Sequence, residues 1–196
     1  MDDITTTIAN YATSFDIDSL APETLATIID HIVDGMGCAI AGYAEQPAAI
    51  ARSMAAETAG AEVGASVFGA AAFSAPDHAA FANAVMMRCL DFNDTFNALT
   101  GGHPSDMIAG ILTAAEISRA DGRKFIGGVH VAYEVFGALA AVIPLRNLGI
   151  DQGVFLAIAT AAGMGHTMGL DQATTANAIS LGVTTTVPLR ASRAGA

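Results

Sequence analysis

Residues 91–106, DFNDTFNALTGGHPSD, form the most polar and turn-rich stretch of an otherwise apolar chain. The stretch brings together one histidine and three aspartates, namely His103, Asp91, Asp94 and Asp106. An imidazole titrates near neutral pH, so His103 is a candidate general base, and a carboxylate beside it can orient it or carry its proton. Any one of these aspartates taken alone is more often a turn or cap residue. Their concentration around a histidine is what predicts acid–base chemistry here.

The same stretch predicts the start of a helix. Pro104 suits the first helical turn, which places His103 near the N-cap and Ser105 within that turn. Gly101 and Gly102 let the backbone approach a ligand closely, while free N–H groups and the positive end of the helix dipole favour an anion. The dipole also favours the neutral form of the imidazole over the charged form. We therefore expect an anion-binding site at Gly101, Gly102 and Ser105, beside a basic His103.

The elements that must position this stretch are helices. Apolar residues recur at spacings of three and four, as in Leu25, Ile28, Ile29 and Ile32. The predicted helices cover residues 22–43, 47–58, 79–90, 107–118, 124–142, 152–168 and 172–181. Residues 60–78 mix Gly, Ser and Pro and are predicted to form a loop. Because no convincing pair of strands occurs, the sequence predicts an all-α fold, an antiparallel helical array.

The length and composition of the chain limit the number of domains and the kind of surface that it can have. Its 196 residues are enough for one domain, and residues 1–196 are predicted to contain no second one. Hydrophobic residues make up 53% of the chain and charged residues only 14%, which is more apolar surface than an ordinary domain can easily cover. We therefore expect self-association, or contact with a portion of the protein outside this chain, to cover the excess.

Two classes of partner are disfavoured. A net charge of −11 with only eight Lys and Arg leaves no basic stripe for a nucleic acid. The apolar runs 125–145 and 153–170 are interrupted by polar residues such as Glu134 and His166, so they suit core helices better than membrane spans. His166 itself is predicted to be a core histidine with satisfied hydrogen bonds. No basic and apolar leader opens the chain, so a cytoplasmic location is expected.

Metal and cofactor sites are not expected either. Cys38 and Cys89 lack the CxxC spacing of zinc sites, and two thiolates are too few for an iron–sulfur cluster. His130 and Glu134 share a helical face but lack a third ligand, which favours a buried hydrogen-bonded pair over a metal site. The sequence therefore predicts chemistry without a metal.

The run ANAVMMRCLDFNDTFNALTGGHPSDMIAGILTAAEISRADGRKFIGGVHVAYEV resembles the MmgE/PrpD family. Members typically show an Asn-Gly pair and a His-x-Leu-Asp-Phe-Asp-Asp-Thr stretch, then His-Pro-Ser-Asp, then an alanine-rich helix. The segments DGMGCAIAGY and SVFGAAAFSAPDHAAFANA upstream, and GLDQATTANAISLGV downstream, resemble the same family in the same order. The similarity spans nearly the whole chain.

The resemblance implies a large helical domain, a smaller α+β lid domain, a homodimer, and no metal or organic cofactor. It implies a lyase or isomerase acting on a small polycarboxylate such as 2-methylcitrate, with dehydration expected first and decarboxylation or epimerisation as alternatives. Asp91, Thr95 and His103 fall on the family's active-site aspartate, threonine and histidine. His103 would then be the base or acid, Thr95 a donor to the substrate, and Asp91 an orienting partner or proton carrier. The predicted anion site would hold a substrate carboxylate.

The chain departs from the family pattern at several positions. The usual Asn-Gly is Asn83 followed by alanine, Arg88 lies where a histidine is usual, and Asn93 replaces the second aspartate. The loop between Thr95 and His103 is also longer than in the decarboxylase subgroup, which disfavours decarboxylation.

The end of the chain is the largest departure. The family's catalytic lysine lies in a Ser-Met-Trp-Lys-like segment after a run resembling LRASRAGA, and this sequence stops at Ala196. We therefore expect a truncated, N-terminal part of the helical domain, without the lid, that has little turnover alone and needs a C-terminal portion as partner. The competing hypothesis is a non-catalytic truncated paralogue or split-gene subunit that serves as a helical dimerisation or binding module.

Overall fold

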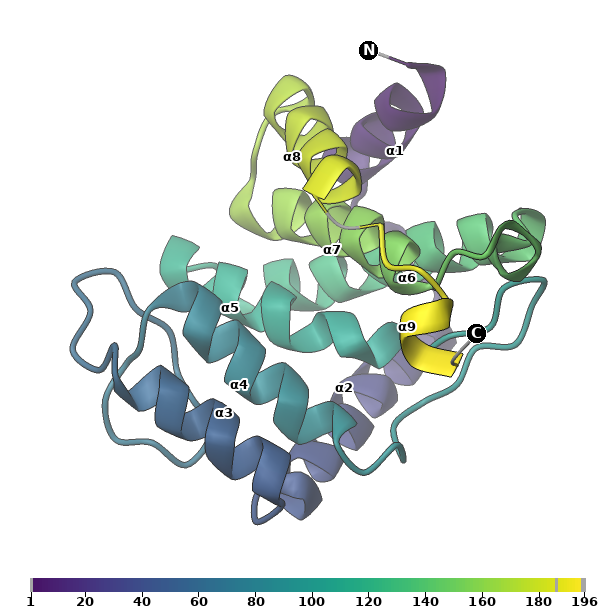
Figure 1. Cartoon of the computed structure of the whole chain (residues 1–196). Coiled ribbons are helices and arrows are strands. Elements are labelled where there is room, and N and C mark those ends of the chain that lie inside the picture. Colours follow the sequence, from purple (N-terminus) through teal and green to yellow (C-terminus); the bar gives the residue numbers. More distant parts are fainter. Residues whose placement is uncertain (1, 186, 195–196) are drawn as a thin grey trace.

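The fold is built from helices throughout (Figure 1). The computed structural model describes residues 2–185 and 187–194. Its elements, in chain order, are α1 (Asp3–Ser14), the 3₁₀ turn η1 (Ile17–Ser19), α2 (Pro22–Gly42), α3 (Gln46–Ala56), α4 (Pro76–Arg88), η2 (Pro104–Met107), α5 (Ile108–Ser118), α6 (Gly122–Val142), η3 (Leu145–Leu148), α7 (Gly153–Met168), α8 (Gln172–Thr185) and α9 (Ala191–Ala194). Over these described residues, β-structure is limited to three isolated bridges. The predicted all-α fold class is confirmed.

The predicted helical segments correspond to α2 through α8. Pro22 and Pro76 open α2 and α4, since the fixed φ of proline suits a first turn and its missing N–H is not needed there. The segment between α3 and α4 is irregular, as predicted, apart from one bridge between Ala65 and Ser74.

Helix α7 lies at the centre of the arrangement, packed against α5, α6 and α8. Helix α4 packs between α2 and α3. It also contacts α5, and so joins the group of α2, α3 and α4 to the group of α5, α6, α7 and α8. Figure 1 shows α1 and α8 at one end of the molecule and α3 and α4 at the other. The loop that contains His103 connects α4 to η2 and α5, so it joins both groups.

Helices α6 and α7 approach each other closely because both carry glycine at the contact. A Cβ atom on Gly163 would lie 2.6 Å from the carbonyl oxygen of Gly128, a distance at which real Cβ atoms are essentially never found. Ala132 on α6 lies at the same contact, and the ring of Phe136 on α6 lies 6.4 Å from the ring of Phe155 on α7. The close packing fixes α6 and the start of α7, which both supply side chains to the candidate site.

Helix α1 is not among the predicted elements. Its sequence contains three consecutive threonines, whose branched side chains lower helix propensity. Tertiary contacts compensate, because Ala9 and Ala12 are fully buried and the Ala12 carbonyl accepts a hydrogen bond from His166 Nδ1 at 2.9 Å. This bond confirms His166 as a core histidine, and burial lowers its pKa.

The expected pairing of His130 with Glu134 is wrong. Glu134 is exposed, whereas His130 is buried with its ring 4.7 Å from the ring of Phe15. Burial lowers the pKa of His130, against a smaller opposing effect of the Glu134 charge. His130 therefore contributes to packing between α6 and the N-terminal segment.

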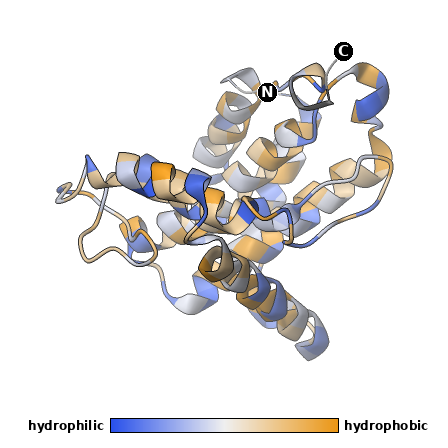
Figure 2. Ribbon diagram, turned by 60° about the horizontal axis from the view of Figure 1, so that its bottom comes forward, coloured by the Kyte–Doolittle hydropathy of each residue, from blue (hydrophilic) through white to orange (hydrophobic). Residues whose placement is uncertain are grey.

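The excess of apolar residues is visible on the surface as well as in the core. Orange, hydrophobic positions occur along all the long helices in Figure 2, and on α2 the side chains of Val33 and Ile40 are 62% and 79% exposed. Two helices, α2 and α6, are long and apolar enough to cross a membrane by length and composition alone, a test that core helices also pass. The expected self-association stays a prediction.

Candidate active site

The polar stretch forms the connection between α4 and η2, and hydrogen bonds hold this loop against the helices. Helix α4 ends at Arg88, and Asp91 then adopts a left-handed backbone conformation with φ 52°. Phe96 and Gly102 exchange two backbone hydrogen bonds of 2.8 and 2.9 Å, which close the loop between them. The buried Thr100 hydroxyl donates to the Ile143 carbonyl at 2.6 Å and so fixes the loop against the end of α6.

His103 occupies the N-cap position of η2, which runs directly into α5, as the position of Pro104 predicts. Its Nδ1 lies 2.7 Å from the carbonyl oxygen of Asp94. A carbonyl oxygen can only accept a hydrogen bond, so Nδ1 carries the proton and Nε2 of the neutral ring is the basic nitrogen. The ring is 18% exposed, which leaves it accessible.

Asp91 and Thr95, the other two predicted catalytic residues, both lie near His103. Asp91 Oδ1 is 3.9 Å from His103 Nε2, and the same carboxylate forms an ion pair with Arg88. The Asp91 side chain is 72% exposed. Thr95 is exposed and lines a cavity together with His103. The structure therefore brings the three residues together from one loop.

Asp94, one of the three aspartates of the polar stretch, is a central residue of the site, with contacts that the sequence did not predict. Its Oδ1 accepts from the Ser105 N–H at 3.0 Å and from the Ser105 hydroxyl at 2.5 Å. Its Oδ2 accepts from the Tyr133 hydroxyl at 2.8 Å and lies 3.6 Å from His31 Nδ1. The anion at the start of η2 is thus the protein's own Asp94. The Ser105 N–H that was expected to be free is already bonded, and the Ser105 side chain is buried.

A second group of contacts surrounds Ser105 on the side of Arg88. Asn93 is buried, and its amide donates to Ser105 Oγ at 2.8 Å and to Asp106 Oδ1 at 2.9 Å. Arg88 Nε lies 3.5 Å from the same Asp106 oxygen. Burial raises the pKa of Asp106, and the Arg88 charge opposes that effect. Two of the positions that depart from the family pattern, Arg88 and Asn93, therefore both contact Asp106.

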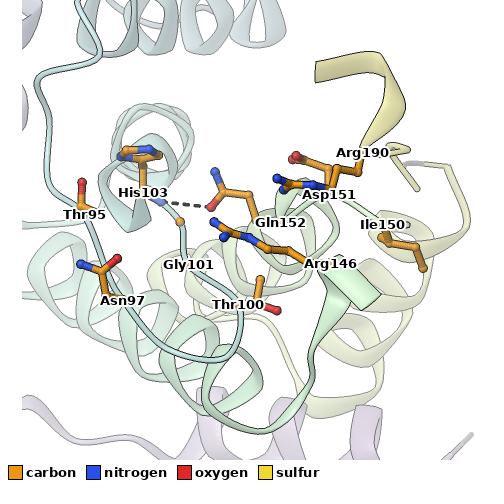
Figure 3. A pocket seen from close by; sticks show the side chains of 11 residues that line it. Thr95, Asn97, Thr100, Gly101, His103, Arg146, Ile150, Asp151, Gln152 and Arg190 are labelled. Atoms are coloured by element: carbon orange, nitrogen blue, oxygen red, sulfur yellow. Dashed lines mark hydrogen bonds between the residues drawn. The ribbon is translucent and has the colours of Figure 1, made fainter. Parts of the chain in front are cut away.

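The cavity beside His103 has a volume of about 230 Å³. Its lining residues are Thr95, Asn97, Thr100, Gly101, Gly102, His103, Arg146, Ile150, Asp151, Gln152 and Arg190. Four predicted site residues, Thr95, Gly101, Gly102 and His103, therefore meet at one cavity, whereas Asp91 and Ser105 lie outside its lining (Figure 3). In the described residues, no three His, Cys, Asp or Glu side chains are grouped as metal ligands would be.

Gln152 connects the loop to the start of α7. Its buried side-chain carbonyl accepts a hydrogen bond of 3.1 Å from the backbone N–H of His103. Gly102 permits this contact, because a Cβ atom there would lie 1.5 Å from Gln152 Oε1 and 2.6 Å from Phe136 Cζ. Gly102 is thus required for close packing behind the imidazole.

We expect the Gly102→Ala substitution to destabilise the protein by about 1–3 kcal/mol, the usual range for overpacking. The added methyl group must displace Gln152 and break its bond to His103. Denaturant unfolding followed by circular dichroism measures the change. Gly101→Ala is the matched control, since its nearest neighbouring atom would be at an ordinary 3.4 Å. Equal stabilities of the two variants would contradict this account of Gly102.

The chain matches the family model for the MmgE/PrpD N-terminal domain over residues 6–196. It is 38% identical over 116 residues to a 2-methylcitrate dehydratase of Cupriavidus necator, an overlap covering 54% of this chain and 24% of that protein. It is 30% identical over 190 residues to the mitochondrial 2-methylcitrate dehydratase of Yarrowia lipolytica, covering 91% of this chain and 36% of the relative. The chain therefore spans only about a quarter to a third of the length of these relatives.

The family match covers nearly all of the described helices and includes the loop with Asp91, Thr95 and His103. The chain belongs to the MmgE/PrpD family, matching its N-terminal domain.

Proposed function

We propose that this chain supplies the proton-transfer groups of a hydro-lyase that dehydrates a small polycarboxylate, with 2-methylcitrate as the leading candidate. The observation that carries the proposal is the hydrogen bonding of the His103 ring and its distance to Asp91. Its Nδ1 is bonded to the Asp94 carbonyl at 2.7 Å, which leaves Nε2 as a base 3.9 Å from the Asp91 carboxylate. Curated relatives named 2-methylcitrate dehydratase support the choice of substrate.

In the proposed reaction, His103 Nε2 takes the proton from a carbon next to a substrate carboxylate. The electron pair of that C–H bond becomes the second bond of a carbon–carbon double bond, and the hydroxyl group on the neighbouring carbon leaves. The proton on the imidazolium then passes to the leaving hydroxyl, so that water is released. Asp91 stabilises the imidazolium, and the Thr95 hydroxyl donates to the oxygen on which negative charge develops.

Two arrangements around these residues support the roles. Arg88 pairs with Asp91 and so holds a carboxylate that is otherwise largely exposed. Gln152 accepts a hydrogen bond from the His103 N–H, and the Asp94 carboxylate accepts one from the Ser105 N–H. The backbone is therefore fixed at His103 and two residues beyond it. A base fixed by its neighbours loses less entropy when the substrate binds and reacts.

The proposal is tested by following the ultraviolet absorbance of the new double bond. The purified chain and, separately, the longest polypeptide encoded by its reading frame are each incubated with 2-methylcitrate. Dehydration by either protein supports the proposal. Failure of both to dehydrate 2-methylcitrate, citrate or related hydroxy acids, with the proteins folded by circular dichroism, would overturn it.

A further inference from the structure

Two arginines from separate segments reach the cavity that contains His103. Arg146 lies in η3 and Arg190 lies directly before α9, and both line the cavity with Gln152. Figure 3 shows Gln152 between His103 and the two arginines, whose side chains extend toward it. The cavity therefore has a basic imidazole on one side and guanidinium groups on the other.

Backbone hydrogen bonds fix the segment that carries Arg190. The Arg190 N–H donates to the Gly149 carbonyl at 2.9 Å, and the Asp151 N–H donates to the Pro188 carbonyl at 2.9 Å. The segment around residue 190 thus lies against the start of α7. Arg146 Nη2 is close to the glycine wall of the cavity, since a Cβ atom on Gly101 would lie 3.6 Å from it.

The side-chain N–H groups of Arg146, Arg190 and Gln152 are available to a ligand. Among side chains that the structure describes, neither Arg146 nor Arg190 forms an ion pair, in contrast to Arg88 and Arg123. Gln152 uses its carbonyl oxygen for His103, so its NH₂ group is the end that can donate to a ligand. The chain has only eight Lys and Arg in total, and two of them line this one cavity.

The charge balance of the cavity favours an anion. Asp151 also lines it, but this carboxylate is buried and accepts a hydrogen bond from the Gly153 N–H at 3.1 Å. Two guanidinium groups against one carboxylate leave a net positive wall in a chain whose overall charge is −11. A guanidinium group presents a planar fork of N–H donors that matches a carboxylate.

We propose that Arg146, Arg190 and Gln152 form a carboxylate-binding subsite, which holds one arm of the substrate away from the carbon where His103 acts. The subsite deepens the function proposed above and rests on it for the reacting end of the substrate. The cavity volume of about 230 Å³ lies just below the roughly 300–1,000 Å³ of drug-binding pockets, which suits a small metabolite. An acid with a single carboxylate cannot occupy both ends, so the subsite selects di- and tricarboxylates.

Binding of propane-1,2,3-tricarboxylate tests the subsite independently of turnover, because this acid has no hydroxyl group to lose. Its Kd is measured by isothermal titration calorimetry for the wild-type chain and for Arg146→Gln, Arg190→Gln and Arg119→Gln. The first two variants are expected to bind roughly tenfold to a hundredfold more weakly, since each loses a charge-assisted contact. Arg119→Gln, an exposed arginine at the end of α5, is the matched control and should bind like wild type. Arg146→Lys should recover only part of the loss, because lysine lacks the planar fork.

The outcomes separate the subsite from the lyase activity. Arginine-dependent binding without turnover of any hydroxy acid would support the subsite and overturn the proposed function. Turnover with an unchanged KM in both arginine variants would overturn the subsite and leave the lyase in place. Absence of binding, or equal loss in Arg119→Gln, would also overturn it. Tighter binding of inorganic phosphate than of the tricarboxylate would overturn the assignment to carboxylates.

Discussion

The His103→Ala substitution is expected to reduce turnover of 2-methylcitrate by about 10²–10⁴-fold in the catalytically active form of the protein. The substitution removes an imidazole that lines the cavity and whose Nε2 lies 3.9 Å from the Asp91 carboxylate. It leaves the Asp94 side-chain contacts to Ser105 and Tyr133 in place, because those bonds do not involve the imidazole. The loss should therefore fall on kcat more than on protein stability.

The measurement is the initial rate of double-bond formation, with circular dichroism to verify folding. His78→Ala is the matched control, since His78 is partly exposed on α4 and pairs with its neighbour Asp77. Added imidazole should restore part of the rate of His103→Ala by entering the space of the lost ring. A variant that keeps more than a third of wild-type activity would show that another group is the base.

Local signals in the sequence were sufficient to predict the start of the helix behind the site. Pro104 predicts that a helix begins after His103, and the structure places His103 at the N-cap of η2. The spacing of apolar residues predicts α2 and α5 through α8 for the same reason, because helical periodicity is set by neighbours within one turn. The family resemblance adds Thr95 and a catalytic role for Asp91. Asp91 lies 3.9 Å from the imidazole, and Thr95 lines the same cavity.

The partners of this loop could not be predicted, because they come from distant parts of the chain. Arg146, Gln152 and Tyr133 reach the site from η3, the start of α7 and α6, and no local spacing relates them to His103. The free N–H expected at the helix start is used by Asp94, which the sequence does not distinguish from the other aspartates nearby. An anion-binding feature at a helix start thus predicts that an anion is bound there, but not whether it belongs to a ligand or to the protein.

Helix α1 also depends on contacts with distant parts of the chain. Its threonines predict weak helix formation, but Ala9 and Ala12 are buried against other helices, and His166 bonds to its backbone. Tertiary packing overrides intrinsic propensity in such a segment. Ile4, Ile8 and Tyr11 recur at spacings of four and three, so a helical signal was present in this segment as well.

The Asp94→Ala substitution is expected to lower the free energy of unfolding by about 3–5 kcal/mol, the usual cost of removing one partner from a buried, charged network. Three donors lose their acceptor at once, namely the Ser105 N–H, the Ser105 hydroxyl and the Tyr133 hydroxyl. Ser105 is fully buried, so water cannot replace the lost bonds without opening the loop. Such a loss is a large fraction of the roughly 5–15 kcal/mol that stabilises a typical domain.

Guanidinium chloride unfolding of wild type, Asp94→Ala, Tyr133→Phe and the double variant measures this network. Tyr133→Phe removes one hydroxyl together with its bond to Asp94, so it is expected to cost only about 1 kcal/mol. Because the two residues share that bond, the double variant should be less destabilised than the sum of the single variants. Asp77→Ala, which removes a carboxylate that is 81% exposed, is the matched control and should change stability far less. If Asp94→Ala unfolds at the same denaturant concentration as this control, the carboxylate does not hold the loop. The Asp94 backbone carbonyl that fixes the tautomer of His103 must then be positioned by other contacts, such as the bridge between Phe96 and Gly102.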